Sequence, residues 1–391
     1  MVTYNTNYIR SSSKKTFKKQ QLNVCSKKNL SHNIYNNAYI LPNKYNSVEY
    51  GGVITNDRLF VDNTGLHEGL GKHYYLDNNI EVICGTIIYI GYLNQCWGHI
   101  ITDFLKKIYF LHSLEGKKFI KEGAKIAFIT YENRPITKEV IELISLANLN
   151  ISNWIHVRKT TLCDRIIVPD NSITRIEVGI RLWSQEYKDT INLIKKNVKN
   201  SIDPQIKTYE KLYFTRTHFP NNRDYGEITI ENIFKKNGFK IISPERHSVA
   251  EQINMLMNCK EFASTEGSIS HNAIFCNEQT KCIIIRKAEY WNSYQITIND
   301  CANLNVIFID AHQSCMVSHD APFGGPFYLC ITKELENFFG HHIFHIPYYI
   351  CPSWFKYKYK EKIKKIYYNL RAKIGLRTKI KLLFRRNIAH D

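Results

Sequence analysis

The stretch KLYFTR at residues 211–216 is an apolar run that ends on an arginine, and EFASTEGSISHN at residues 261–272 is an apolar run that ends in a glycine turn. Between and after them, strand-like segments alternate with amphipathic segments of helical period. This alternation predicts a parallel α/β domain, in which ligands bind at the carboxyl ends of the strands. Arg216 and Gly267 both fall at predicted strand ends, so we expect a ligand at this edge.

The chain of 391 residues is long enough for two domains, each with its own core. A similar alternation precedes the first stretch, and Asp203-Pro204 marks a linker between the two runs. We therefore expect five parts: a basic flexible arm at 1–30, an N-terminal α/β domain at 31–204, a C-terminal α/β domain at 205–312, an irregular return segment at 313–352, and a basic amphipathic tail at 353–391.

The formal net charge of +18 is concentrated at the two ends of the chain. Residues 1–28 hold seven Lys and Arg and no acid, residues 353–391 hold thirteen against two acids, and the body between them is neutral. A nucleic-acid enzyme usually carries a basic stripe on its body. Apolar residues recur at spacings of three and four from Tyr359 to Ile374 with lysines between them, which predicts a helix on an anionic membrane surface.

The cysteines and the start of the chain indicate a compartment. Eleven cysteines without a C-x-x-C pair predict reduced thiols, and the polar, basic start shows no secretory signal. With the basic tail, these features predict a cytoplasmic protein held peripherally on the inner face of the plasma membrane.

The glycine turn and two arginines of the C-terminal domain suit a diphosphate. Gly267 lets the backbone approach phosphate oxygens without a Cβ in the way. Arg216 at a strand end and Arg223 in the loop after it can bind such oxygens bidentately. An ordinary strand-to-helix turn with two surface arginines fits the same residues. The candidate donor-binding residues are Arg216, Arg223, Gly267, Ser268, His271 and Asn272.

A histidine and an aspartate in the N-terminal domain suit proton transfer. Apolar positions between 100 and 111 follow helical spacing, and His99 and Asp103 are four residues apart, so they share a face near the start of this helix. The pair is a candidate general base, and a helix-capping pair is the alternative interpretation.

In this order the motifs resemble those of glycosyltransferase family 61, a family of capsule-biosynthesis type. The matching pieces are GHxxxDFL at 98–105, LYFTR at 212–216 with Arg223 after it, GF at 238–239 with SxxEQ at 248–252, and EGSxxxNxxF at 266–275. The resemblance extends from near residue 80 to near residue 290. Many members have a histidine before the glycine where this chain has Glu266.

The resemblance implies a GT-B fold, which consists of two facing Rossmann-like domains with a cleft between them. It implies a nucleotide-sugar, for which we expect a UDP-sugar, bound by the C-terminal domain, and a glycan or lipid-linked glycan acceptor on the N-terminal domain. The implied reaction is an inverting, metal-independent transfer in capsule- or lipopolysaccharide-type glycan synthesis, with the nucleotide-sugar as co-substrate and no further cofactor. Asp103, His99 and Glu266 are the candidate general bases, and the sequence leaves the choice open.

Two observations bear on other functions and on a metal. The chain contains no D-x-D carboxylate pair, and His341, His342 and His345 have no carboxylate or thiol at a helpful spacing, so no metal site is expected. A nucleic-acid-binding protein using the basic ends is one alternative, which the neutral body disfavours. A transferase fold that has lost activity and serves as an assembly partner is another, which the retained motif residues disfavour.

Overall fold

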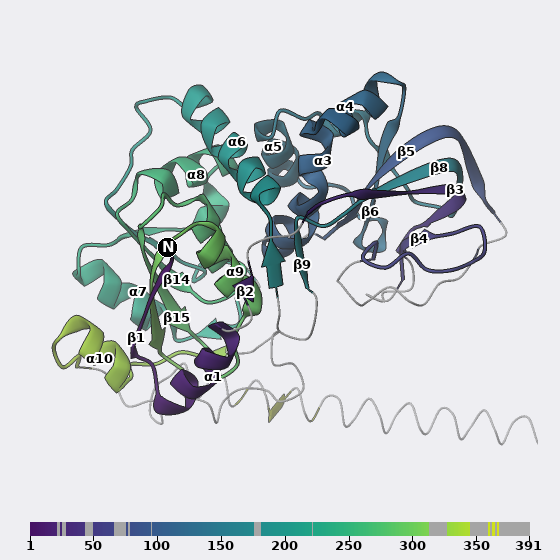
Figure 1. Cartoon of the computed structure of the whole chain (residues 1–391). Helices are drawn as coiled ribbons and strands as arrows, with labels where there is room; N and C mark the ends of the chain where they lie inside the picture. The colour runs from purple at the N-terminus through teal and green to yellow at the C-terminus, as the bar shows by residue number, and fades with distance from the viewer. Residues whose placement is uncertain are drawn as a thin grey trace, which may run out of the picture.

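The computed structural model describes residues 1–21, 24–25, 29–43, 50–65, 76, 79–94, 96–175, 181–220, 222–312, 327–344, 359, 362–363 and 366. Within these ranges the chain forms two six-stranded sheets, one mixed and one wholly parallel. Figure 1 shows the mixed sheet at the right and the parallel sheet at the left, with α5 (Lys138–Leu146) and α6 (Gln185–Ser201) between them. The fold is α/β, as predicted.

The parallel sheet has the strand order β1-β16-β15-β14-β11-β13. Its strands read as near-continuous apolar runs because both faces are covered. In β11, Leu212 and Phe214 face one core cluster while Tyr213 faces another on the opposite side. The strands are β1 (Thr3–Tyr8), β11 (Lys211–Phe214), β13 (Lys240–Ile242), β14 (Glu261–Thr265), β15 (Lys281–Arg286) and β16 (Asn305–Asp310).

Helices cover both faces of the parallel sheet. Side chains of α7 (Glu227–Lys236) and α10 (Lys333–Phe339) pack on the face of Tyr213. Side chains of α8 (Val249–Asn258) and α9 (Ser293–Cys301) pack on the other face. α8 begins with a capping box, because Ser248 and Glu251 each bond the other's backbone amide.

The start of the chain is ordered, so the prediction of a flexible arm at 1–30 is wrong for the residues that the structure describes there. β1 pairs in parallel with β16 at the edge of the sheet, and α1 (Ser11–Gln21) follows it. Tyr4 stacks on Phe308 at a ring separation of 6.0 Å, and Phe17 packs edge-on to the same ring. In the sequence of this segment the lysines, which lie on the exposed side of α1, outnumber the few aromatic residues that are buried against the sheet.

The mixed sheet has the order β4-β3-β8-β5-β6-β7, and β3 runs antiparallel to its neighbours β4 and β8. The longest strand of this sheet, β5, runs unbroken from Glu81 to Leu93. The strands are β3 (His32–Leu41), β4 (Gly52–Ile54), β5 (Glu81–Leu93), β6 (Lys125–Thr130), β7 (Ile155–His156) and β8 (Thr161–Pro169).

The helix predicted over residues 100–111 consists of several short pieces. They are α2 (Trp97–His99), the π-helical turn η1 (Ile100–Phe104), η2 (Leu105–Lys107) and α3 (Ile108–His112). Single π turns are frequent at functional sites. The remaining elements are β2 (Val24–Cys25), α4 (Leu114–Lys121), η3 (Tyr131–Asn133), η4 (Ile151–Asn153), β9 (Ile173–Arg175), β10 (Arg181–Trp183), β12 (Asp224–Tyr225), η5 (Pro244–Arg246), η6 (Ser270–Phe275) and β17 (Phe327–Tyr328).

The two sheets share one hydrophobic core. A single cluster of buried side chains runs from Ile88 of β5 through Tyr187 of α6 to Phe262 of β14. The Tyr187 hydroxyl also donates to the carbonyl of Ile101, 3.0 Å away. This packing places the carboxyl end of β5 opposite the carboxyl end of β14, which is where the site lies.

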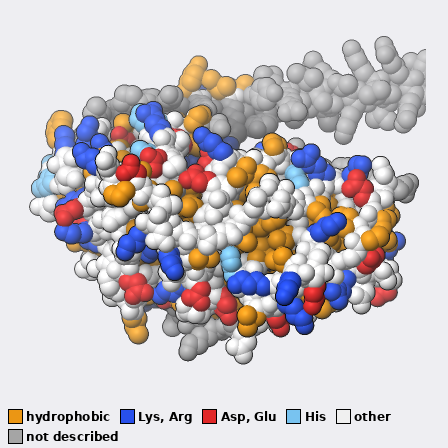
Figure 2. Space-filling view, turned by 90° about the horizontal axis from the view of Figure 1, so that it is seen from above, with side chains coloured by type: hydrophobic (Ala, Val, Ile, Leu, Met, Phe, Trp, Pro, Cys, Tyr) orange, Lys and Arg blue, Asp and Glu red, His pale blue; other side chains and the backbone are white. Residues whose placement is uncertain are grey.

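Much of the predicted return segment and tail lies outside the described residues. Residues 327–344 form β17 and α10, and of the tail only Tyr359, Lys362, Ile363 and Ile366 are described, all helical and exposed. No helix in the described part of the chain is long and apolar enough to cross a membrane. Figure 2 shows acidic and basic side chains interspersed over one face of the body, as expected from its charge balance.

Candidate active site

The two sequence motifs meet where the sheets face each other. The indole N–H of Trp97 donates to Oδ1 of Asn272 over 2.8 Å, and Sγ of Cys96 lies 3.2 Å from Oγ of Ser268. Between these contacts Gly98 packs so closely that a Cβ there would lie 2.8 Å from the Ser268 hydroxyl. Residues 96–98, which precede η1, therefore pack directly against the glycine turn.

His99 and Asp103 form a hydrogen-bonded pair in this contact region. His99 Nδ1 lies 2.6 Å from Asp103 Oδ2. A carboxylate only accepts, so Nδ1 carries the proton and Nε2 is left as an acceptor. The His99 side chain is 33% exposed and that of Asp103 only 1%. The histidine can thus meet a substrate, and the aspartate acts through it.

Asp103 is held by groups that the sequence analysis did not single out. The Tyr294 hydroxyl at the start of α9 donates to Asp103 Oδ1 over 2.9 Å, and the hydroxyl of Thr102 donates to Oδ2 over 3.2 Å. The buried ammonium of Lys106 lies 3.8 Å from Oδ1. Two hydroxyl donors and a cation thus surround the Asp103 carboxyl group behind His99.

His271 faces His99 from the parallel sheet and is buried. Burial, reinforced by the charge of His99, lowers the pKa of His271 to about 4, so its imidazole is neutral near pH 7. The side-chain amide of Asn292 lies 3.1 Å from Nε2; since this amide donates, the proton of His271 is on Nδ1, beside Gly98. His271 therefore lines the site as a neutral side chain.

Within the glycine turn, the side chains and the backbone have different tasks. The hydroxyl of Ser270 and the side chain of Asn272 bond inside the fold, to Gly267, Gln295, Ile269 and Trp97. Within the described part of the chain, the backbone amides of Ser268 and Ile269 donate to no acceptor. Asn272 therefore holds the turn in shape, and the two amides are free for a ligand.

Two cations lie beside this turn. Lys287, at the end of β15, is so close to Gly267 that a Cβ on the glycine would lie 3.4 Å from Nζ. Nζ lies 3.1 Å from both oxygens of Asp224, and Arg216 Nη1 lies 3.9 Å from the same carboxylate. The structure thus places Arg216 and the glycine turn at the same edge, joined through Asp224 and Lys287.

The other predicted arginine lies at the rim. The Arg223 side chain is exposed, and its carbonyl accepts from the amide of Phe327, whose ring lies 4.5 Å below the Lys287 ammonium. Arg223 thus borders the cation pair.

Glu227 is a buried carboxyl next to the cation pair. Its Oε1 accepts from the backbone amide of Arg216 over 3.1 Å and from the Tyr213 hydroxyl over 3.4 Å. Burial, and next the nearby charge of Asp224, raise the pKa of Glu227 to about 8. Near pH 7 the group is therefore mostly protonated, so it adds little negative charge where the cations lie.

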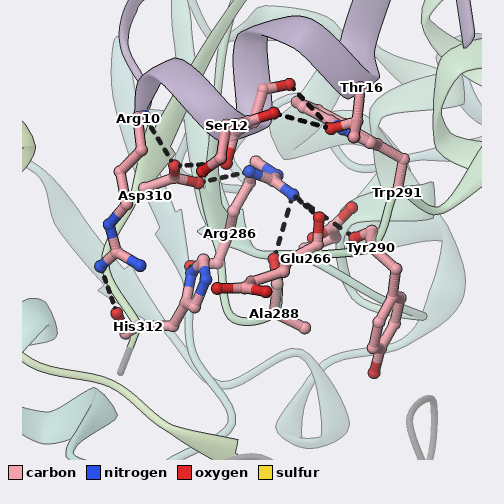
Figure 3. A network of polar contacts seen from close by, with 12 residues as sticks. Arg10, Ser12, Thr16, Glu266, Arg286, Ala288, Tyr290, Trp291, Asp310 and His312 are labelled. Carbon is pink, nitrogen blue, oxygen red and sulfur yellow. Dashed lines mark hydrogen bonds and ion pairs between the residues drawn. The ribbon is translucent and has the colours of Figure 1, made fainter. Parts of the chain in front are cut away.

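Glu266 belongs to a second buried group of polar residues, behind the turn. Figure 3 shows it beside Arg286, which pairs with Asp310 and donates to carbonyls of residues 288–290. Its Oε1 accepts from the amide of Asn292 over 3.3 Å, and burial raises its pKa. Glu266 reaches His271 only through Asn292, so among the three candidate bases it is placed farthest from the interface between the sheets.

The histidine-rich segment is not part of the site. His342 pairs with Glu336 at 2.5 Å, His341 bonds the carbonyl of Phe339, and His345 lies outside the described residues. Across the residues that the structure describes, no group of three His, Cys, Asp or Glu side chains could hold a metal ion.

Sequence analysis missed Lys287, Tyr294, Asn292 and Lys106. Lys287 had a signal, since it follows an apolar strand next to the glycine-turn strand, and parallel neighbours end at the same edge. Asn292 and Tyr294 lie at the start of a helix whose sequence contains no recognisable motif. Lys106 is one of two adjacent lysines, which are usually found on a helix surface.

Comparison with known proteins agrees with the motifs. No curated protein matches the chain. The family model described as glycosyltransferase 61 matches residues 97–283, a segment that begins at the Trp97 contact and ends within β15. Over this segment the chain matches the glycosyltransferase 61 family, and a sugar-transfer activity is what that match implies.

Proposed function

We propose that the protein transfers a sugar from a nucleotide-sugar to a glycan acceptor with inversion and without a metal ion, using a GT-B arrangement of its two sheets. The observation that carries this proposal is the contact of residues 96–98, which lead directly into the His99–Asp103 pair, with the glycine turn of the parallel sheet. It brings a proton acceptor and an anion-binding edge to one place.

His99 is the general base. Its Nε2 takes the proton of the acceptor hydroxyl as that oxygen attacks the anomeric carbon, and the bond from this carbon to the diphosphate oxygen breaks on the opposite side. Asp103 keeps the imidazole in the required tautomer and stabilises the imidazolium that forms. Positioned general bases accelerate such steps by about 10²–10⁴-fold.

The leaving diphosphate is stabilised by the carboxyl edge of the parallel sheet. Arg216 and Lys287 supply positive charge, and the amides of Ser268 and Ile269 supply hydrogen-bond donors. Preorganised donors and cations of this kind are often the largest contribution to catalysis. They do here what a divalent ion does in metal-dependent transferases.

The acceptor and location follow from the charge pattern. A polysaccharide or glycolipid of the cell surface is the substrate class that suits a protein with basic ends. On α1, Lys15, Lys18 and Lys19 are exposed while Phe17 is buried in the core, so this helix presents lysines outward. With the basic tail, it would hold the protein on the anionic inner face of the plasma membrane.

The test is a thermal-shift screen against UDP-, GDP- and CMP-sugars, followed by turnover with the donor that stabilises the fold. We expect one nucleotide class, UDP first, to raise the melting temperature, and the product to have inverted anomeric configuration by NMR. Transfer should persist in EDTA. No stabilisation by any nucleotide-sugar, together with salt-dependent binding of RNA or DNA, would replace this proposal with nucleic-acid binding.

A further inference from the structure

The mixed sheet carries a polar cavity that the proposed reaction does not use. It has a volume of about 340 Å³, at the lower end of the range for small-molecule sites. The carboxyl end of β8, the start of β3 and the loop of residues 55–63 form its walls. Lys107 of η2 and Thr174 of β9 complete the lining, which includes no residue of the parallel sheet.

The lining of the cavity combines aromatic faces with side-chain oxygens. Tyr35 and Phe60 supply the rings, and Asn33, Asn63, Asp62 and Asp170 supply amides and carboxylates. Burial, and next the charges of Asp170 and Asp62, raise the pKa of Tyr35. This is an acceptor-rich surface beside an apolar one.

The two carboxylates have different surroundings. Asp170 Oδ2 accepts from the amide and hydroxyl of Ser31 at 3.0 and 2.9 Å. Asp62 is exposed and, among the residues that the structure describes, makes no hydrogen bond or ion pair. The ammonium of Lys107 on the cavity wall donates to the carbonyl of Pro169 over 2.7 Å. Asp62 is thus the group most available to a ligand.

Hydrogen bonds connect the lining of the cavity to the segment that carries Asp103. Ser172, next to the lining residue Asn171, donates its amide and hydroxyl to the carbonyl of Lys106 at 2.9 and 2.6 Å. Lys106 contacts Asp103, and the next residue, Lys107, lines the cavity. A ligand here would contact Lys107, which follows Asp103 by four residues in the chain.

We infer that this cavity binds an uncharged saccharide unit of the acceptor and rejects uronic acids and other anionic sugars. The inference rests on the proposed function, which supplies a glycan acceptor. Sugar hydroxyls donate to the carboxylates and amides, and the apolar face of the ring packs on Tyr35 and Phe60. An anionic sugar would bring its charge against Asp62 and Asp170, whereas the cation on the wall, Lys107, is buried and directed to the carbonyl of Pro169.

The experiment compares binding of methyl hexosides with that of the matching methyl uronides to the full chain, by saturation-transfer NMR and calorimetry without donor. We expect saturable binding of at least one neutral hexoside and binding about tenfold or more weaker for its uronide, the scale of a hydrogen bond to a charged group. Asp62→Asn should reduce this preference, and Asp62→Lys should reverse it. The matched control is Asp57→Asn, an exposed acid in the same loop that does not line the cavity.

Several outcomes separate this inference from the proposed function. Equal binding of hexosides and uronides, or an Asp62→Asn variant indistinguishable from Asp57→Asn, would overturn the inference. Turnover of a nucleotide-sugar with no saccharide binding in the cavity would also overturn it, while leaving the transfer reaction in place. Selective hexoside binding without turnover of any nucleotide-sugar would support the cavity and remove the proposed reaction.

Discussion

Trp97 donates its indole N–H to the side-chain oxygen of Asn272 over 2.8 Å, and this bond joins the carboxyl end of one sheet to the carboxyl end of the other. Asn272 is buried, and its amide nitrogen caps the turn by donating to the carbonyl of Ile269. One side chain therefore holds the shape of the turn and the position of the opposite lobe. His99 follows Trp97 by two residues, so this contact also fixes the position of His99.

The first prediction concerns the His99–Asp103 pair. In Asp103→Asn the new amide can donate to His99 Nδ1, which would place the imidazole proton on Nε2 and remove the proton acceptor. We expect kcat to fall by about 10²–10⁴, with the melting temperature little changed because the two side chains have the same shape. His99→Gln should cost a similar factor, and the double variant little more, because the residues act as a unit.

The control for this pair is Asp189→Asn, an exposed acid on α6 that should leave kcat unchanged. Steady-state kinetics with the donor identified by thermal shift provides the measurement. If both single variants retain a kcat near that of the unchanged protein, His99 is not the base and Glu266 becomes the candidate.

The contact between the two motifs explains why the pair could be found in the sequence but not ranked. His99, Asp103 and Glu266 all follow or border motif residues, so each was a reasonable candidate. Which of them lies at the contact between the two sheets depends on how two segments about 170 residues apart in the chain pack together, and on the burial that results. Hydrophobic periodicity shows which residues share a helical face, but it does not show what that face packs against.

The second prediction concerns the close approach at Gly98. A Cβ at this position would lie 2.8 Å from Oγ of Ser268 and 3.0 Å from its Cα, so Gly98→Ala must push the two lobes apart. We expect a loss of about 1–3 kcal/mol in the free energy of unfolding, as for other overpacked sites, and a clear loss of turnover. Chemical denaturation and kinetics measure the two effects.

Ser268→Ala provides the matched test of this clash. Alone it should cost little stability, and combined with Gly98→Ala it should restore part of the loss, because the nearest clashing atom is gone. A Gly98→Ala protein with unchanged stability and turnover would show that the two lobes do not depend on this contact.

The third prediction concerns the cation at the donor edge. Arg216 is 26% exposed, lies over the ring of Phe219 and has a distant contact with Asp224, so Arg216→Ala should leave the fold intact. We expect the Kd for UDP, measured by calorimetry, to rise about tenfold or more, the scale of a charge-assisted hydrogen bond. Lys235→Ala removes an exposed lysine from α7 and should leave the Kd unchanged. An equal, small effect of both variants would place the phosphates elsewhere.

The sequence predicted the α/β fold class and the alternation of the C-terminal sheet because these depend on local periodicity. It did not predict β1, since pairing with a strand 300 residues away leaves no local signal beyond two tyrosines. Lys287 and Glu227 were missed for a related reason. Their importance comes from neighbouring strand ends and from burial, and burial of a charged residue runs against its usual preference.

The last prediction uses the titration of Glu227. Because its pKa is raised to about 8, the folded protein binds a proton that the unfolded chain releases near pH 4.5. Its contribution to stability is therefore fully present below pH 4.5 and is lost as pH rises through about 8, by at most about 1.4 kcal/mol per pH unit. Glu227→Gln, which stays neutral, should match the unchanged protein near pH 5 and exceed it in stability at pH 8.

The same proton should control ligand binding. Above pH 8 the ionised Glu227 adds negative charge beside Asp224 and competes with a diphosphate for Arg216 and Lys287, so the Kd for UDP should rise between pH 7 and pH 9. In Glu227→Gln that rise should be largely absent, while Glu245→Gln, an exposed acid in the same lobe, should behave like the unchanged protein. Denaturation curves and calorimetry across this pH range make the comparison. If Glu227→Gln and Glu245→Gln show parallel pH profiles, Glu227 is already ionised at neutral pH and the cation pair must bind the phosphates against two buried carboxylates.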